Sequence, residues 1–181
     1  MRQTTVFTCA CGQSAFELSG SPMLAAECWC ESCRAAARTL EALPDAPPMA
    51  EQGGGTRFVL YRKDRVTPLR GTDQLREYRL GTEAKTRRVV ATCCNSAMFL
   101  EFQGGHWLSL YSQRLPMWQR PVPNLRTMMS DAPTGTPPDD AIPSYDRQSA
   151  GFMFRLLGAW IAMGFRAPKL DYVKGALDAR A

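Results

Sequence analysis

Three cysteines lie within six residues in the motif Cys28-Trp29-Cys30-Glu31-Ser32-Cys33-Arg34. Two further groups accompany it, Cys9-Ala10-Cys11-Gly12 and the adjacent pair Cys93-Cys94, and together they hold all seven cysteines. Zinc binds thiolates at about 2.3 Å in a tetrahedron, so the sulfurs must approach to within roughly 4 Å. Cysteines two apart on extended backbone face the same way, whereas cysteines three apart meet across a turn. The clusters therefore predict zinc ligands.

A disulfide framework is the alternative interpretation of so many cysteines. Residues 1–8 contain no apolar stretch that could serve as a secretory signal, and an odd number of cysteines leaves one without a partner. We therefore expect a cytoplasmic protein. In a reducing compartment, clustered cysteines bind metals or perform redox chemistry rather than form structural bridges. Metal binding is the favoured interpretation.

Composition is typical of a soluble folded protein. Of the 181 residues 45% are hydrophobic and 22% charged, which suffices for one domain with a substantial core. The apolar run from Phe152 to Phe165 is interrupted by Arg155 and is shorter than the roughly 20 residues that cross a bilayer. We expect no membrane association.

Short runs of β-branched and aromatic residues predict a mainly β protein. These runs are 58–61, 88–91, 98–102 and 106–111. Gln103-Gly104-Gly105 predicts a hairpin turn between the last two. A short alanine-rich helix is predicted from Cys33 to Leu43, followed by a loop that begins at Pro44.

A second proline-rich stretch, from Pro133 to Pro143, separates this β body from a helix predicted over Ser149–Arg166. Apolar residues lie on nearly every side of that helix, which is typical of burial on several sides. Core burial is the expected arrangement, and a homodimer interface is the alternative. The predicted division is residues 1–130 for the β domain and 131–181 for the connection and the helical extension.

The segment from Arg57 to Arg88 contains ten basic residues against four acidic ones. A solvated strand face is the ordinary interpretation of such a segment. Binding of an anionic ligand is the alternative, because arginine suits bidentate contacts with carboxylate or phosphate. No motif of a known nucleic-acid-binding module is present, so a nucleic acid is not an expected partner.

The cysteine motifs resemble those of the glutathione-dependent formaldehyde-activating enzyme family, whose domain also occurs in centromere protein V. Cys9-Ala10-Cys11-Gly12 and Cys28–Arg34 match the first two motifs of that family. The third motif aligns only at Cys94 and Ser96, because Ala91 occupies the position of a family cysteine and Cys93 is additional. The resemblance extends over roughly residues 4–111 and describes a divergent member.

The resemblance implies a zinc-binding β-tent fold of short antiparallel sheets, to which the C-terminal helix is an extension. It also implies two zinc ions. One is structural and belongs to the first and third motifs, with Cys9, Cys11 and Cys94 as ligands here. The other is held by the middle motif, whose members Cys28, Cys30 and Cys33 become the predicted catalytic residues.

Three thiolates leave the fourth tetrahedral position open, as in catalytic zinc sites. A substrate thiol such as glutathione could occupy that position as thiolate. The resemblance thus implies a carbon–sulfur lyase, similar to S-hydroxymethylglutathione synthase, that acts on an adduct of glutathione or another thiol with an aldehyde such as formaldehyde. Arg34 and the Arg57–Arg88 segment are candidates for binding the substrate carboxylates.

Two arrangements remain open for the adjacent pair, because neighbouring residues on a regular strand face opposite ways. Either a turn brings Cys93 and Cys94 together to the first zinc, with Cys93 as its expected fourth ligand, or Cys93 faces the middle cluster and closes it. Closure would favour a non-catalytic zinc module that binds an acidic protein or nucleic acid through its arginines. A thiol redox protein that uses Cys93 and Cys94 is a third, less favoured hypothesis. His106 is interpreted as a strand residue rather than a ligand.

Overall fold

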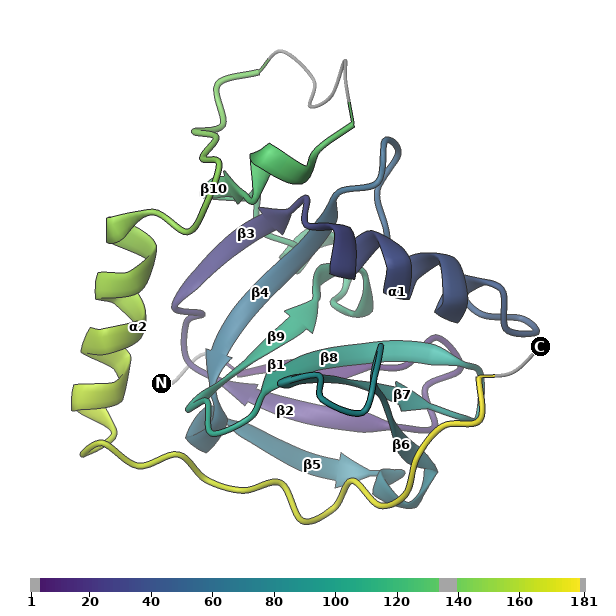
Figure 1. Ribbon diagram of the computed structural model, residues 1–181. Helices are drawn as coiled ribbons and strands as arrows, with labels where there is room; N and C mark the ends of the chain where they lie inside the picture. Colours follow the sequence, from purple (N-terminus) through teal and green to yellow (C-terminus); the bar gives the residue numbers. More distant parts are fainter. Residues whose placement is uncertain (1–3, 134–139, 180–181) are drawn as a thin grey trace.

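A computed structural model describes residues 4–133 and 140–179, which form two β-sheets and two α-helices (Figure 1). The smaller sheet has the order β1-β2-β5, with bounds Thr4–Thr8, Ala15–Ser19 and Val66–Arg70. The larger sheet has the order β10-β3-β4-β9-β8-β7-β6, with bounds Leu125–Thr127, Leu24–Cys28, Thr56–Arg62, Trp107–Tyr111, Ser96–Phe102, Thr86–Ala91 and Leu75–Tyr78. The α-helices are α1, Glu31–Glu41, and α2, Ala150–Ala162. The predicted mainly β fold with a C-terminal helix is confirmed.

Neighbouring strands are antiparallel, except that β10 runs parallel to β3. Short 3₁₀ turns connect several of the strands, at Lys63–Arg65, Thr72–Gln74, Ser112–Arg114, Met117–Gln119 and Met129–Asp131. The predicted runs at 58–61, 88–91, 98–102 and 106–111 correspond to β4, β7, β8 and β9. Part of the predicted proline-rich connection, residues 134–139, lies outside the described residues.

The main core lies between the two sheets. Successive strand residues point to opposite faces, so alternate positions of the larger sheet meet the smaller one. Phe16 of β2 illustrates the packing, because its ring meets Phe7 of β1 at 6.2 Å and Phe99 of β8 at 5.9 Å between centroids. Apolar burial of this kind contributes roughly 25 cal/mol per Å² to folding.

The opposite face of the larger sheet carries helix α1. Cys33, Ala36, Ala37 and Leu40 are the buried residues of this helix, at the spacing of one helical face. The helix begins at Glu31, slightly earlier than predicted, because the Cys30 side chain caps it and accepts a hydrogen bond from the Cys33 amide. The helix start and the middle cysteine cluster are therefore one structural unit.

Helix α2 lies at the flank of the same sheet face and contacts it with one side only (Figure 1). Leu156 is its one buried residue and Phe152 packs against the same cluster, whereas Phe154 is 71% exposed. The expectation of burial on several sides is wrong. A single sheet face covers one side of a helix, and among the described residues no second element covers the other.

The chain after α2 returns across the protein to the far edge of the larger sheet (Figure 1, yellow). Tyr172 packs against the main core, with its ring 5.9 Å from that of Phe16. Backbone hydrogen bonds then join Glu77 of β6 to Gly175 and Leu177. These contacts tie the C-terminal extension to the β body, while the division at residue 130 stays a prediction.

His106, in the turn between β8 and β9, holds α2 against the body. Its Nε2 atom lies 2.9 Å from the carbonyl oxygen of Leu156, and its ring stacks on Trp160 with an interplanar angle of 11°. Burial lowers the pKa of His106 below its usual value, although the hydrogen bond to Leu156 opposes this effect, and the nearby Lys63 and Arg62 add to the lowering. His106 therefore has a structural role, and it lies just before β9 rather than in the strand as interpreted from the sequence.

The lowered pKa predicts a loss of stability in mild acid. The unfolded chain binds a proton at His106 at a higher pH than the folded chain, so this contribution is complete above about pH 6.5 and declines as the pH falls. Between pH 7.5 and pH 5.5 the denaturant midpoint of unfolding should fall more for the wild type than for His106→Gln. The glutamine amide can still donate a hydrogen bond to the Leu156 carbonyl. Protonation of other groups is common to both proteins. Equal falls would contradict this role for His106.

Candidate metal centres and the adjoining cavity

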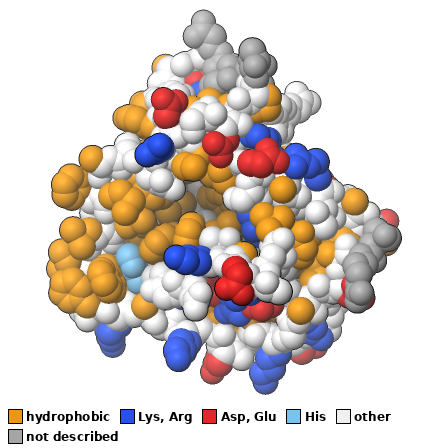
Figure 2. Space-filling model, viewed as in Figure 1, with side chains coloured by type: hydrophobic (Ala, Val, Ile, Leu, Met, Phe, Trp, Pro, Cys, Tyr) orange, Lys and Arg blue, Asp and Glu red, His pale blue; other side chains and the backbone are white. Residues whose placement is uncertain are grey.

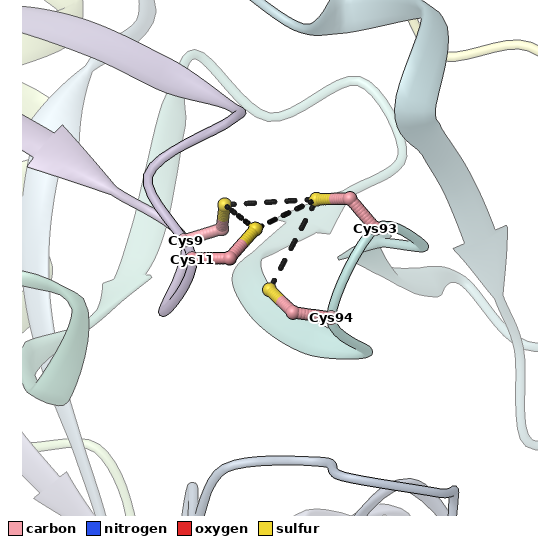
Figure 3. A group of neighbouring side chains, drawn as sticks. All are labelled: Cys9, Cys11, Cys93 and Cys94. Carbon is pink, nitrogen blue, oxygen red and sulfur yellow. Dashed lines mark hydrogen bonds between the residues drawn. The ribbon is translucent and has the colours of Figure 1, made fainter.

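Four cysteine sulfurs converge where the β1–β2 hairpin meets the β7–β8 turn (Figure 3). Cys9 and Cys11 come from the hairpin, and Cys93 and Cys94 come from the turn. The Cys93 sulfur lies 3.7 Å from that of Cys9, 3.5 Å from that of Cys11 and 4.0 Å from that of Cys94. All four sulfurs lie within 4.8 Å of one another. We call this group the four-cysteine centre.

The backbone of both turns explains how adjacent cysteines reach one centre. Asn95 has a φ of 48° and Gly12 a φ of 77°, so both lie in the left-handed region that reverses the chain tightly. The Ser96 hydroxyl accepts a hydrogen bond from the Ala10 amide at 3.0 Å and thereby joins the two turns. Of the two arrangements considered for Cys93, the structure shows the one in which it joins the first cluster.

The charge state of the four-cysteine centre suits a cation. Burial raises the pKa of Cys94, but hydrogen bonds from the Ser96 hydroxyl and from Cys11 outweigh it and bring the pKa to about 6. Burial is also the main reason why the pKa values of Cys9 and Cys93 are raised, so these thiols resist ionisation beside an existing thiolate. A divalent ion would remove that penalty. Four sulfur donors at these distances fit tetrahedral zinc in a closed structural site.

A second group consists of Cys28, Cys30 and Cys33, whose sulfurs also lie within 4.8 Å of one another. Cys28 ends β3, Cys30 caps α1 and Cys33 lies in its first turn, with 3.8 Å between the sulfurs of Cys28 and Cys33. Hydrogen bonds from Cys28 and Cys33 lower the pKa of Cys30, and the positive end of the helix dipole favours the same thiolate. We call this group the three-cysteine centre.

A buried cation lies beside the three-cysteine centre. Arg88 is fully buried and donates a hydrogen bond to the Ser32 carbonyl at 2.8 Å, while its Nε and one terminal nitrogen have no hydrogen-bond partner among the described residues. The hydrogen bond with Cys28 lowers the pKa of Cys33 most and the charge of Arg88 lowers it further, but the Cys30 side chain and burial outweigh both and keep that pKa raised. Within the described residues, no ion pair joins Arg88 to a carboxylate.

The buried charge of Arg88 indicates whether a metal ion fits the three-cysteine centre. An unpaired cation in the protein interior costs several kcal/mol, so it requires an anionic neighbour. Three thiolates around a divalent ion carry one net negative charge, which Arg88 would balance. The donor set of the three-cysteine centre and its surroundings therefore fit a zinc ion with one ligand position free.

A cavity of about 480 Å³ opens beside the three-cysteine centre. Its lining combines the three cysteines with side chains from both helices, the larger sheet and the adjoining loops: Ala26, Ser32, Phe58, Leu60, Thr86, Leu100, Phe102, Trp107, Ser109, Thr127, Met128, Gln148, Phe152, Met153 and Leu156. Figure 2 shows hydrophobic side chains around a hollow on this face of the molecule. The four-cysteine centre has no part in this lining.

The first 45 residues carry a family match. The model of the glutathione-dependent formaldehyde-activating enzyme family matches residues 4–45, the segment with the first two cysteine motifs and α1. Over this segment the chain is similar to the family, in agreement with its first two cysteine motifs. No curated protein matches the chain. A crystal structure of a Rhodobacter sphaeroides protein, a structural genomics target, is similar at 16% identity and a TM-score of 0.42, over 77% of this chain and 99% of that chain.

Arg34 is engaged within the chain. Its guanidinium donates hydrogen bonds to the Trp29 carbonyl and to the Glu31 carboxylate, and Arg34 is absent from the cavity lining among the described residues. The structure therefore does not bring Arg34 to the three-cysteine centre as a free side chain. Its predicted role in substrate binding stays a prediction, and Arg88 is the arginine that lies at the centre.

The cavity wall was missed by the sequence interpretation, although part of its pattern is visible. Phe58 and Leu60, and likewise Leu100 and Phe102, are spaced two apart, as required for one face of a strand. The contribution of α2 has no such signal, because nothing local indicates which part of the body that helix covers. Within the described residues, neither helix has the length and apolar character needed to cross a membrane.

Proposed function

We propose that the chain is a zinc-dependent carbon–sulfur lyase that forms and cleaves the adduct of a thiol with an aldehyde at the three-cysteine centre. The observation that carries this proposal is the contrast between the two centres. Four cysteines close the first centre. Three form the second, and all three also line the cavity. Closed sites are typical of structural zinc, and sites with three protein ligands are typical of catalytic zinc.

The chemistry follows from the free ligand position. Zinc bound there would lower the pKa of a substrate thiol and so supply a nucleophile at neutral pH. In adduct formation the thiol sulfur bonds to the aldehyde carbon, the carbonyl π electrons move to oxygen, and the proton of the thiol ends on that oxygen. No oxidant or reductant is needed. The reverse reaction breaks the same carbon–sulfur bond.

The residues of the chain have separate roles in this proposal. Cys28, Cys30 and Cys33 hold the metal, and the N-terminus of α1 fixes two of these three ligands. Arg88 balances the net negative charge of the centre from the protein side. The hydroxyl of Ser109 lies in the cavity wall, where it can hydrogen-bond to the developing alcohol of the adduct.

The alternative, a non-catalytic module that binds an acidic partner through the Arg57–Arg88 segment, has less support. Arg87 pairs with Glu77 and Glu101, and Lys63 pairs with Glu101 as well. Further cations of the segment pair with acids or donate to backbone carbonyls: Arg57, Arg62, Arg70, Arg76, Arg79 and Arg88. Most of these basic side chains therefore already form ion pairs or hydrogen bonds within the chain.

The proposal predicts that Cys30→Ser abolishes catalysis without unfolding the protein. The zinc content should fall from two ions to one per chain, because the four-cysteine centre is intact. Exchange NMR with ¹³C-labelled formaldehyde and a thiol measures how fast the adduct forms and breaks. We expect acceleration by the wild type and by the exposed-site control Ser130→Ala, and only the uncatalysed rate with Cys30→Ser. Full acceleration by Cys30→Ser would refute the proposal.

A further inference from the structure

The cavity beside the three-cysteine centre has an apolar wall built from two parts of the chain. Phe58 and Leu60 of β4 and Leu100 of β8 line it from the sheet, and α2 contributes Phe152 and Leu156 from the opposite side. The volume of about 480 Å³ lies in the range of small-molecule sites, roughly 300–1,000 Å³. A ligand that fills this cavity is therefore in contact mainly with hydrocarbon.

The polar groups in the wall are few and uncharged. Apart from the cysteines, the polar lining consists of hydroxyls and one amide: Ser32, Thr86, Ser109, Thr127 and Gln148. Among the described residues, no lysine, arginine, histidine, aspartate or glutamate lines the cavity. A ligand carboxylate or ammonium in this cavity would lose water without gaining an ion pair, which is costly.

Three arginines close in sequence to cavity elements, Arg34, Arg88 and Arg155, are engaged within the chain. Arg34 donates to Glu31 and to the Trp29 carbonyl, and Arg155 of α2 donates to the Met23 carbonyl at 3.2 Å. Arg88 donates to Ser32 and lies beside the metal-ligand cysteines rather than in the lining. Glutathione carries two carboxylates and an ammonium group, for which the described cavity lining offers no charged partner.

We infer that the three-cysteine centre takes an apolar, uncharged thiol, with an aromatic or branched alkyl group, rather than glutathione. The inference rests on the proposed function, because the thiol sulfur would occupy the free ligand position. The apolar group would fill the space between β4 and α2. The hydroxyls and the amide in the wall are enough to form hydrogen bonds with the single hydroxyl group of the aldehyde adduct.

Helix α2 sets this preference. It lies outside residues 4–45, the segment that carries the family match, and it supplies Phe152, Met153 and Leu156 to the wall. Hydrophobic side chains on α2 and on the sheet surround the hollow in Figure 2. The metal ligands thus come from the matched segment, and part of the substrate wall comes from the C-terminal extension.

The direct test compares two thiols on the zinc-loaded protein by calorimetry, benzyl mercaptan and glutathione. Benzyl mercaptan should bind about 10-fold or more tightly, because its ring exchanges water for the apolar wall. Benzyl methyl sulfide has the same ring but cannot supply a thiolate, so it should bind more weakly than benzyl mercaptan. Equal binding of the two thiols, or tighter binding of glutathione, would overturn the inferred substrate class and leave the proposed lyase chemistry standing.

Two neighbouring variants of α2 provide a matched pair. Met153 lines the cavity and is 53% exposed, whereas Phe154 is 71% exposed and outside the described lining. Met153→Lys places a cation at the cavity edge, so the preference for benzyl mercaptan over glutathione should fall about 10-fold. Phe154→Lys should leave the preference unchanged. An equal effect of both variants would contradict the wall assigned to α2.

A different result would overturn the proposed function itself. If neither thiol binds to the zinc-loaded protein and neither adduct exchanges faster than in buffer, the three-cysteine centre is not a thiol site. Both the inferred apolar substrate and the proposed lyase function would then be refuted. Accelerated exchange with glutathione alone would retain the function and overturn the apolar substrate.

Discussion

Cys11→Ser is expected to remove the metal from the four-cysteine centre and to unfold most of the β body. Cys9 and Cys11 belong to the hairpin of the smaller sheet, whereas Cys93 and Cys94 belong to a turn of the larger one. The metal would therefore join the two sheets that enclose the main core. Structural zinc binding supplies roughly 10 kcal/mol or more that is coupled to folding, against a total stability of about 5–15 kcal/mol for a domain.

Zinc analysis and thermal melting followed by circular dichroism measure this effect. The matched control is Cys30→Ser, the same substitution in the three-cysteine centre, which should lose one zinc ion and keep a cooperative transition. Unchanged melting and full zinc content in Cys11→Ser would show that these four cysteines do not form a structural centre.

Arg88→Met is expected to weaken metal binding at the three-cysteine centre by about 10- to 100-fold, the range found when a group supporting metal ligands is lost. Methionine fills similar space but removes the charge that balances the thiolates. The cation itself has no carboxylate partner among the described residues, so its loss leaves no buried acid behind. The four-cysteine centre should keep its zinc.

Competition with a chelator measures the affinity of each centre. Arg88→Lys keeps the charge and should recover part of the affinity. Arg87→Met provides the adjacent control, because Arg87 pairs with Glu77 and Glu101 instead of approaching the cysteines. If Arg88→Met and Arg87→Met bound zinc as tightly as the wild type, the buried charge would have no role at the centre.

The sequence was informative wherever local spacing determines structure. The motif around Cys30 predicted a ligand cluster, and the helix that follows it was predicted nearly in its place from its alanine-rich run and the proline after it. The runs that became β4 and β8 were recognisable from their β-branched and aromatic residues.

The remainder depends on contacts between distant parts of the chain. Two arrangements were open for Cys93 because its side-chain direction depends on a turn, which a strand pattern does not specify. The exposure of α2 could not be predicted from its apolar residues, since composition does not specify how many sides a neighbour covers. Arg88 was one of ten basic residues in its segment, and only the fold distinguishes it as the buried one.

The most direct test of the central claim is ¹¹³Cd NMR of the cadmium-loaded protein, because the chemical shift reports how many thiolates bind each ion. Two resonances are predicted, one from four sulfurs and one from three sulfurs with a non-sulfur ligand. Added benzyl mercaptan should move only the second resonance toward the first, and Cys30→Ser should remove it. A single resonance, or a second one that no thiol shifts, would contradict an open three-cysteine centre.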